Sequence, residues 1–258
     1  MNFNQQVILI TGAAQGIGAA IAENMALQGA RLALCDVQGE AVASLAARLR
    51  AQGSDACSHA LDVRDSMQID RVAGYVEREF GPIEVLVNVA GVLRTGPIID
   101  YADADWEHTF AVNATGVFRV CRAVGRHMQA RRRGVIVTVA SNAASVPRQH
   151  MAAYCASKAA STQFMRCLGL ELAPFGIRCN VVAPGSTDTA MQRQLWQDEH
   201  AEQAVIEGNL QAMRLGIPLG KLASASDIAQ AVSFLASSAA SHMTMQTMCV
   251  DGGATLGA

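Results

Sequence analysis

Short apolar runs recur along this chain, and segments of helical length separate them. Several runs are apolar at consecutive positions rather than at alternate ones, as in VILIT and VIVTVA. Such runs are typical of strands in a parallel sheet, because helices cover both of its faces. The expected strands are 7–11, 31–36, 83–88, 135–140, 177–183 and 248–251, and the expected helices are 18–28, 40–52, 66–80, 105–131, 152–174 and 227–237.

This alternation predicts an α/β protein with a doubly wound parallel sheet of the Rossmann type, which binds ligands at the carboxyl ends of its strands. The 258 residues contain no linker, repeat or low-complexity segment, so we expect a single domain over 1–258. The 184–220 segment interrupts the alternation of strands and helices, because it is long and has no clear strand. It could be a lid over the substrate or an ordinary surface insertion.

The composition narrows the class of protein. Hydrophobic residues make up 51% of the chain and charged residues 16%, which is typical of a globular protein, and the net charge of -2 does not favour a polyanion as partner. The cations Arg131, Arg132 and Arg133 follow a predicted helix and are expected to be solvated there, so we predict no nucleic-acid partner. No apolar run reaches the ~18–20 residues of a membrane helix, and the first residues do not resemble a signal peptide. We therefore expect a cytoplasmic protein with no membrane partner.

The cysteines and histidines show no pattern of a metal site. The seven cysteines are scattered without a C-x-x-C pair, and the six histidines lack ligand spacing. We expect reduced, buried thiols and no metal.

A glycine-rich loop follows the first expected strand and precedes the first expected helix. It reads TGAAQGIG and covers residues 11–18. Gly12 would allow a tight turn, Gly16 would let the backbone approach a pyrophosphate, and Gly18 would let the helix pack closely on the strand. A glycine-rich turn without a ligand is the alternative, but the strand-loop-helix context favours a dinucleotide.

An acidic residue, Asp36, ends the second expected strand about twenty residues after this loop. A carboxylate there can accept hydrogen bonds from the adenosine ribose, which predicts NAD as cofactor, whereas NADP would require a cation for its 2′-phosphate. Neither Gln15 nor Val37 supplies one. Asp36 could also cap the next helix. Asp62 could reach the adenine or cap the helix that follows it.

The pair Tyr154 and Lys158 lies in the predicted helix 152–174. Their i, i+4 spacing places both side chains on one face of the helix. An ammonium, together with a cationic nicotinamide, would lower the pKa of the phenol, which suits a general acid–base. A tyrosine packed over a lysine stem is the alternative.

These motifs occur in the order found in short-chain dehydrogenases/reductases, and the chain resembles that family along its full length. TGAAQGIG resembles the TGxxxGxG loop, NVAG at 88–91 resembles NNAG, and YCASK is the YxxxK signature. Asn113 in FAVNATG and Ser141, thirteen positions before Tyr154, also match, as do NVVAPG and VDGG. Val89 departs from the family, because it replaces the second asparagine of NNAG, which should weaken local turn hydrogen bonds.

The resemblance implies roles for single residues. Tyr154 would transfer the proton, Lys158 would bind the nicotinamide ribose, Ser141 rather than Ser145 would hold the substrate oxygen, and Asn113 would hold a relay water. The cofactor-binding positions that it implies are Gly12, Gln15, Gly16, Ile17, Gly18, Asp36, Asp62, Val63, Asn88, Ala90, Gly91, Tyr154, Lys158, Pro184, Gly185 and Thr187.

Stretches at 90–96, 139–160, 178–196, 215–223 and 250–258 resemble family members that oxidise a carboxylated cyclic diol. Such a substrate needs a cation near the catalytic face, and either Arg94 or Arg148 could supply it. Met191, Gln192 and Trp196 could close over the ring. A ketoacyl reductase that uses NADPH and a catalytically silent dinucleotide-binding protein are the alternative functions. The resemblance also implies a homo-oligomer, with a tetramer favoured.

Overall fold

A seven-stranded sheet in the order β3-β2-β1-β4-β5-β6-β7 forms the middle of the molecule, and every neighbouring pair of strands is parallel. The computed structural model describes residues 1–196 and 198–257. Its strands are β1 (Val7–Thr11), β2 (Arg31–Asp36), β3 (Ala56–Ala60), β4 (Ile83–Asn88), β5 (Gly134–Val139), β6 (Ile177–Pro184) and β7 (Thr247–Val250). The predicted doubly wound α/β fold is confirmed.

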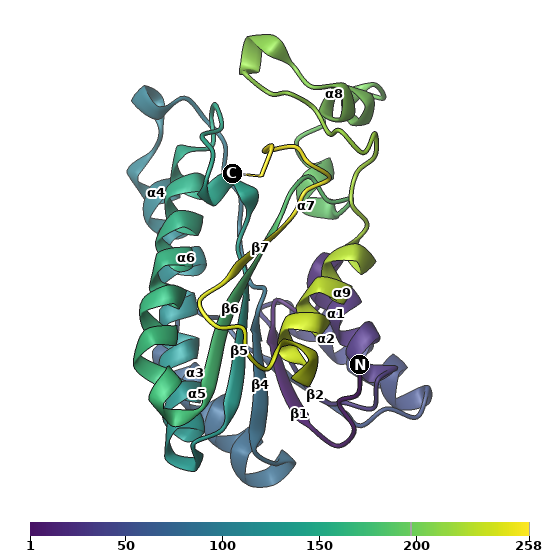
Figure 1. Cartoon of the computed structure of the whole chain (residues 1–258), viewed down its shortest axis with the longest axis vertical. Helices are drawn as coiled ribbons and strands as arrows, with labels where there is room; N and C mark the ends of the chain where they lie inside the picture. The colour runs from purple at the N-terminus through teal and green to yellow at the C-terminus, as the bar shows by residue number, and fades with distance from the viewer. Residues whose placement is uncertain (197, 258) are drawn as a thin grey trace.

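Helices cover both faces of this sheet (Figure 1). One face carries α1, α2 and α9, and the other carries α3, α5 and α6. The helices are α1 (Gly16–Ala26), α2 (Gly39–Ala51), α3 (Ser66–Tyr75), α4 (Asp103–Phe110), α5 (Val117–Arg131), α6 (Ala152–Leu172), α7 (Ala190–Arg193), α8 (Ala201–Glu207) and α9 (Ala225–Ala236). No helix in the described ranges is long and apolar enough to cross a membrane.

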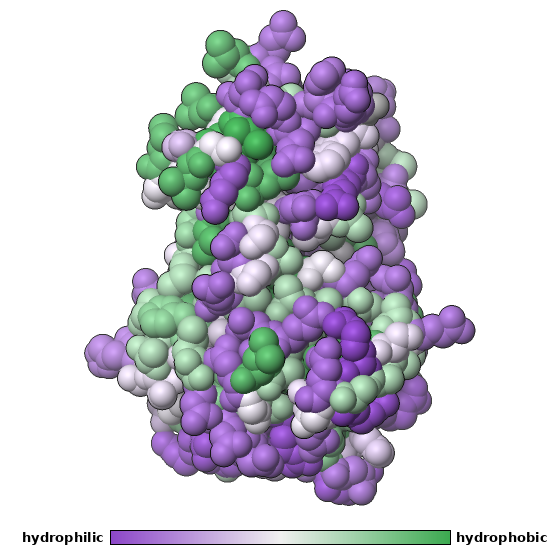
Figure 2. Space-filling view, turned by 90° about the vertical axis from the view of Figure 1, so that its right-hand side faces the viewer, coloured by the Kyte–Doolittle hydropathy of each residue, from purple (hydrophilic) through white to green (hydrophobic). Residues whose placement is uncertain are grey.

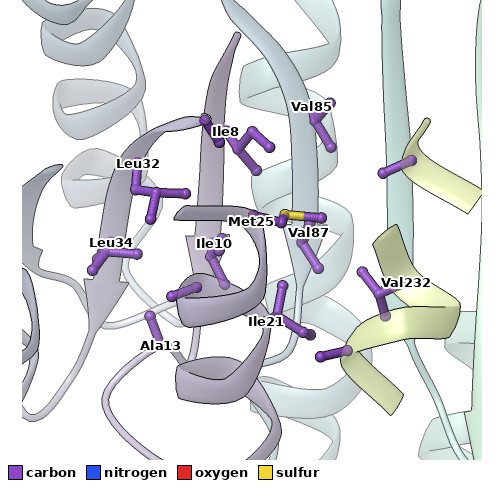
Figure 3. Close-up of a cluster of buried hydrophobic side chains, with 14 of the residues drawn as sticks. Ile8, Ile10, Ala13, Ile21, Met25, Leu32, Leu34, Val85, Val87 and Val232 are labelled. Carbon is purple, nitrogen blue, oxygen red and sulfur yellow. The ribbon is translucent and has the colours of Figure 1, made fainter. Parts of the chain in front are cut away.

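The core lies on both faces of the sheet because successive strand residues point in opposite directions. In β1, Ile8 and Ile10 pack toward α1 and α9, whereas Val7 and Leu9 pack toward the other helix layer. Figure 3 shows Ile8 and Ile10 beside Ile21 of α1 in the first of these layers. Each face of β1 is therefore closed to water, which explains why its sequence is apolar without alternation.

Three elements differ from the expected ones. The sequence pattern missed β3, because this strand lies at the edge of the sheet, pairs only with β2, and has Ala56 as its one buried residue. The expected helix 105–131 is interrupted by a π-helical turn over Ala111–Gly116, and the expected helix 66–80 ends in a similar turn over Val76–Phe80. Such turns often accompany functional positions.

Of the three arginines at the end of α5, Arg132 and Arg133 are exposed as expected, whereas Arg131 is half-buried, which corrects the expectation for that residue. Arg131 forms a half-buried ion pair with Glu77 at 2.8 Å, and Arg133 pairs with Glu84 at 3.0 Å. Arg132 donates to the carbonyl oxygen of Pro174 at 2.7 Å. This run therefore ties the end of α5 to its neighbours.

The cysteines are all free, but not all of them are buried. Cys167 and Cys249 are exposed, so the expectation of buried thiols is wrong for these two. Burial raises the pKa of the Cys179 thiol to about 12, so this thiol stays protonated near neutral pH.

The strand order reverses beside β1, which pairs with β2 on one side and β4 on the other. In sheets of this kind, the loops after the two central strands separate at the reversal and leave a crevice at their carboxyl ends. The glycine loop follows β1 at this point, and the 184–220 segment follows β6 at the same end of the sheet.

Candidate active site

A cleft of about 500 Å³ opens at the carboxyl ends of the strands. It is lined by most of the residues singled out from the sequence, namely Gly12, Gln15, Gly16, Ile17, Gly18, Asp36, Asp62, Val63, Ala90, Gly91, Ser141, Arg148, Tyr154, Lys158, Pro184, Gly185, Thr187, Met191 and Gln192. Four predicted residues do not line it: Asn88, Arg94, Asn113 and Trp196.

The glycine loop is as tight as its sequence predicts. Gly12 has a φ of +69°, and a Cβ atom there would lie 2.5 Å from the backbone nitrogen of Ala90. At Gly18 a Cβ atom would lie 1.9 Å from the carbonyl oxygen of Gly12. Helix α1 begins after Gln15, whose side chain makes no capping hydrogen bond. The first backbone N–H groups of α1 therefore remain available to an anion such as a pyrophosphate.

Asp36 is buried at the end of β2 and supports the glycine loop. Its Oδ2 accepts a hydrogen bond from the backbone N–H of Ala14 at 3.0 Å, and its Oδ1 accepts one from Gln38 at 2.9 Å. Because Gln38 occupies the N-cap position of α2, Asp36 is not the cap of that helix, which corrects one of the two expected roles. Asp36 also lines the cleft, and its contact with a ribose stays a prediction.

Asp62 also differs from one expectation, because Asp65 caps α3. Asp62 lines the cleft and forms an ion pair with Arg64 at 2.6 Å. The hydrogen bond from Arg64 lowers the pKa of the Asp62 carboxyl. Arg64 is therefore a cation at this end of the cleft that already has an acidic partner.

Asn88 lies below the cleft rather than in its wall. Its Nδ2 donates to Thr138 Oγ1 at 3.1 Å and to Cys121 Sγ at 3.2 Å. This side chain therefore joins β4 to β5 and α5, and it acts on the cleft only by positioning the loop that follows. In that loop, the N–H of Val89 still donates to the carbonyl oxygen of Thr11 at 3.2 Å.

Tyr154 and Lys158 lie one turn apart on α6, and both are buried. The Lys158 Nζ atom donates to the carbonyl oxygen of Val139 at 3.0 Å and lies 5.7 Å from the centre of the Tyr154 ring. Ser141 begins the 3-10 turn Asn142–Ala144, and its Oγ accepts a hydrogen bond from the N–H of Ala143 at 3.1 Å. Because that contact uses an acceptor position, the Ser141 hydroxyl keeps its proton for donation to an oxygen in the cleft, either that of Tyr154 or that of a substrate.

Burial dominates the ionisation of this pair. It raises the pKa of Tyr154 to about 12, although a hydrogen bond with Ser141 acts in the opposite direction. It also lowers the pKa of Lys158 to about 8. Among the protein's own groups, burial therefore sets the direction of the Tyr154 pKa, and the lowering expected from Lys158 and a nicotinamide together stays a prediction.

Asn113 is fully buried in the π-helical turn before α5. Its Oδ1 accepts from the backbone N–H of Val92 at 2.8 Å, and its Nδ2 donates to Val92 O at 2.9 Å and to Ser157 Oγ at 3.1 Å. Both donors of the amide are therefore in use, and its side chain fixes the loop after β4 against α6. The predicted relay water near Asn113 stays a prediction.

The 184–220 segment contributes Met191 and Gln192 to the cleft wall, but not Trp196, which lies beside the Arg193 guanidinium. This segment stands over the carboxyl end of the sheet in Figure 1. Figure 2 shows apolar surface gathered on the upper part of the molecule, and the exposed apolar residues that the segment supplies are Leu210, Met213, Leu215 and Leu219. Its role as a lid stays a prediction.

Of the two arginines considered for a substrate carboxylate, the structure places only Arg148 in the cleft wall. Arg94 is exposed and lies 3.8 Å from Asp105, so it is not a cleft residue. Sequence reasoning missed a second cleft arginine, Arg214, near the far end of the 184–220 segment. The available signal was its position directly before the 215–223 stretch that resembles the diol-oxidising members of the family.

Comparison with known proteins agrees with this fold and cleft. Residues 6–200 match the family model of the short chain dehydrogenases, and the chain therefore belongs to this family. It is 55% identical to a 2,3-dihydro-2,3-dihydroxybenzoate dehydrogenase of Bacillus subtilis over 98% of this chain and 97% of the relative. It is 42% identical to the Escherichia coli enzyme of the same name over the whole of both chains. A gluconate 5-dehydrogenase from Burkholderia cenocepacia, solved with NADP and tartrate, superposes with a TM-score of 0.92 at 32% identity and covers 99% of this chain and 97% of its own.

Proposed function

We propose that this protein is a dehydrogenase that oxidises 2,3-dihydro-2,3-dihydroxybenzoate to 2,3-dihydroxybenzoate with NAD, in catechol siderophore biosynthesis. The observation that carries the proposal is the placement of Ser141, Tyr154 and Lys158 in the wall of one cleft with the uncapped start of α1 and the Asp36 carboxylate. The Bacillus subtilis and Escherichia coli relatives, which match nearly the whole chain, carry this name and support the choice of substrate.

The chain's own residues supply the proton chemistry. Ser141 donates a hydrogen bond to the hydroxyl oxygen that is being oxidised, and Tyr154 as phenolate removes the proton of that hydroxyl. A bound nicotinamide supplies the hydride acceptor and a positive charge. The oxidised ring then tautomerises to an aromatic catechol, which makes the overall reaction strongly downhill. Because burial disfavours the Tyr154 phenolate, this charge and the Lys158 ammonium must offset the raised pKa in the working complex.

NAD rather than NADP is the proposed cofactor because of the charges at the ribose end of the cleft. Asp36 presents a carboxylate there, which would repel a 2′-phosphate. The nearby cation, Arg64, is already paired with Asp62 at 2.6 Å. The fold alone does not decide this point, since the related gluconate 5-dehydrogenase was solved with NADP.

The proposal is tested by supplying the dihydrodiol acid to purified protein with either nicotinamide and following absorbance at the reduced-cofactor band. We expect turnover with NAD and at least a roughly tenfold lower kcat/KM with NADP. Tyr154→Phe should lower kcat by about a hundredfold or more while calorimetric NAD binding is unchanged. Tyr101→Phe is the matched control, because the Tyr101 hydroxyl only donates to the carbonyl oxygen of Arg94.

Three outcomes would contradict the proposal in whole or in part. A preference for NADPH with ketoacyl substrates would favour the ketoacyl reductase, and it would mean that Asp36 does not select the cofactor. Nicotinamide binding without turnover of any cyclic diol would favour a catalytically silent protein. Turnover of other cyclic diols at comparable kcat/KM would leave the reaction class intact but reject the named substrate.

A homotetramer in the cytoplasm is the proposed state of the protein. Phe118 on α5 and Leu170 on α6 are exposed apolar side chains of the same helix layer, and they support subunit contacts through that layer. Light scattering after gel filtration would test the number of subunits. A monomer at micromolar concentration would contradict this part of the proposal.

A further inference from the structure

Two arginines from distant parts of the chain line the catalytic end of the cleft. Arg148 lies on the loop between Ser141 and Tyr154, and Arg214 lies near the end of the 184–220 segment. Both side chains are half-buried, and both belong to the cleft wall that also contains Met151 and Tyr154. The structure therefore brings two cations to the site where the substrate ring would bind.

These two guanidinium groups have no acidic partner within 4 Å among residues 1–196 and 198–257, whereas the exposed Arg94 and Arg193 each have one. Both line the same cleft, where burial lowers the pKa of Arg214 and the positive charge of Arg148 lowers it further. A partly desolvated pair of like charges is unfavourable, and a bound anion would relieve the repulsion.

The Cys155 thiol, next to Tyr154, is affected by the charges of both arginines. Burial raises the pKa of the Cys155 thiol, while the charges of Arg148 and Arg214 both lower it. The carbonyl oxygen of Arg148 accepts a hydrogen bond at 3.3 Å from the N–H of Met151, the residue before α6, so Arg148 lies near the first turn of α6, where Cys155 directly follows Tyr154. The opposite end of the same cleft carries Asp36, so the cleft is acidic where the ribose is expected and basic where the reaction is expected.

The backbone around Arg214 holds it in a defined place. Asn209 and Arg214 exchange two backbone hydrogen bonds, each of 2.8 Å, and so close a short hairpin. Met213 has a left-handed backbone with a φ of +52°, and Gly216 has a φ of +86°. Arg214 is thus presented to the cleft by a structured turn within the segment rather than by an extended loop.

We infer that Arg148 and Arg214 together bind the carboxylate of the ring substrate, and that Arg214 is a specificity-determining residue which the 184–220 segment adds to the catalytic site. A guanidinium binds a carboxylate through two parallel hydrogen bonds, and two guanidiniums can share its two oxygens. The inference rests on the proposed function for the identity of the substrate. It predicts that a charged ring binds tightly only when this segment is in place.

The test compares two product-like ligands of the same shape, 2,3-dihydroxybenzoate and its neutral amide, 2,3-dihydroxybenzamide. Calorimetry on the full chain with saturating NADH measures the ratio of their dissociation constants. We expect the wild type to bind the acid at least about tenfold more tightly than the amide. Arg214→Gln and Arg148→Gln should each reduce this ratio to about threefold or less, and Arg214→Lys should restore part of it. Arg94→Gln is the matched control and should leave the ratio unchanged.

The outcomes separate this inference from the proposed function. A wild-type ratio that persists in Arg214→Gln, or that is lost only in Arg94→Gln, would overturn the inference even if the dihydrodiol acid is turned over. Absence of turnover of the acid by the wild type would overturn the proposed function, while the ratio of acid to amide would still decide the role of the arginines. Arg148→Gln, which lies outside the segment, keeps the test valid if Arg214→Gln disturbs the fold of the segment.

Discussion

The Lys158 ammonium lies 5.7 Å from the centre of the Tyr154 ring and donates to the Val139 carbonyl oxygen at 3.0 Å. Both side chains are buried, and burial favours the neutral form of each. In their neutral forms Tyr154 is a proton donor and Lys158 is a proton acceptor. Burial therefore favours a neutral donor–acceptor pair and disfavours the phenolate and the ammonium. Its consequences for stability can be measured without any substrate.

We predict that Lys158→Met removes a pH dependence of stability that the wild type shows. The pKa of Lys158 falls from its ordinary value of 10.5 to about 8 in the folded protein. Between pH 8 and pH 10.5 the unfolded chain keeps the Lys158 proton, whereas the folded chain loses it. The free energy of unfolding therefore rises as the pH rises through this range, and it falls as the pH falls from 10.5 to 8. The difference in unfolding free energy, wild type minus variant, should rise by roughly 3 kcal/mol from pH 8 to pH 10.5.

Urea unfolding at several pH values measures this difference. The buried thiols of Cys35, Cys121 and Cys179 have raised pKa values and reduce stability at high pH, but they are present in both proteins and cancel. A difference that is constant over this pH range would show that Lys158 is not desolvated in solution. The variant should also have no measurable turnover, since it lacks the group proposed to bind the nicotinamide ribose.

We predict that Asp36→Ala weakens NAD binding and its preference over NADP together. The change removes the carboxylate from the ribose end of the cleft, and it leaves the backbone N–H groups of Ala14 and Gln38 without their acceptor. KM for NAD should rise by about tenfold, and the ratio of kcat/KM for NAD to that for NADP should fall by at least about tenfold. Steady-state kinetics with both cofactors measures this. Asp55→Ala is the control, because Asp55 pairs with Arg31 on the surface, and an equal effect in the control would contradict the role of Asp36.

The sequence allowed prediction of those features that depend on local spacing. The strands Val7–Thr11 and Ile83–Asn88 follow from short, mainly apolar runs, and the shared face of Tyr154 and Lys158 follows from the helical repeat alone. The glycine loop was predictable for the same reason, since its strand and its helix are adjacent in the chain.

The features that the sequence did not reveal depend on contacts between distant residues. Whether Arg94 or Arg214 reaches the cleft depends on the path of long loops, which periodicity does not determine. The direction of the Tyr154 pKa depends on burial by the whole fold rather than on the neighbouring lysine. The edge strand Ala56–Ala60 was missed because one partner strand and little burial leave it without an apolar pattern.

We predict that Gly18→Ala is strongly destabilising. The added Cβ atom would lie 1.9 Å from the carbonyl oxygen of Gly12, so the backbone of the loop or of α1 would have to move. The free energy of unfolding should fall by roughly 3 kcal/mol or more. Gly74→Ala is the matched control, because Gly74 lies within α3 and a Cβ atom there meets nothing within 4 Å. The free energy of unfolding of Gly74→Ala should rise by about 0.5–1 kcal/mol. Thermal and urea unfolding would measure both, and similar effects at the two glycines would contradict the packing seen at the loop.

We predict that Asp251→Ala lowers kcat although Asp251 performs no chemistry. Its carboxylate accepts hydrogen bonds from the N–H of Gly253 at 2.9 Å, from the hydroxyl of Thr255 at 2.7 Å, and from Asn142 Nδ2 at 3.3 Å. Because Asn142 directly follows Ser141, loss of this anchor should let the Ser141 hydroxyl move away from the substrate oxygen.

We expect kcat of Asp251→Ala to fall by about tenfold, with KM for NAD nearly unchanged, in assays with the dihydrodiol acid. Thr255→Val is the matched control, because it removes the threonine hydroxyl and leaves the hydrogen bond from Asn142 to Asp251 intact. It should retain most of the wild-type kcat. An equal loss in both variants would mean that the effect comes from the carboxyl-terminal turn as a whole, and wild-type kcat in Asp251→Ala would mean that Ser141 is positioned without this anchor.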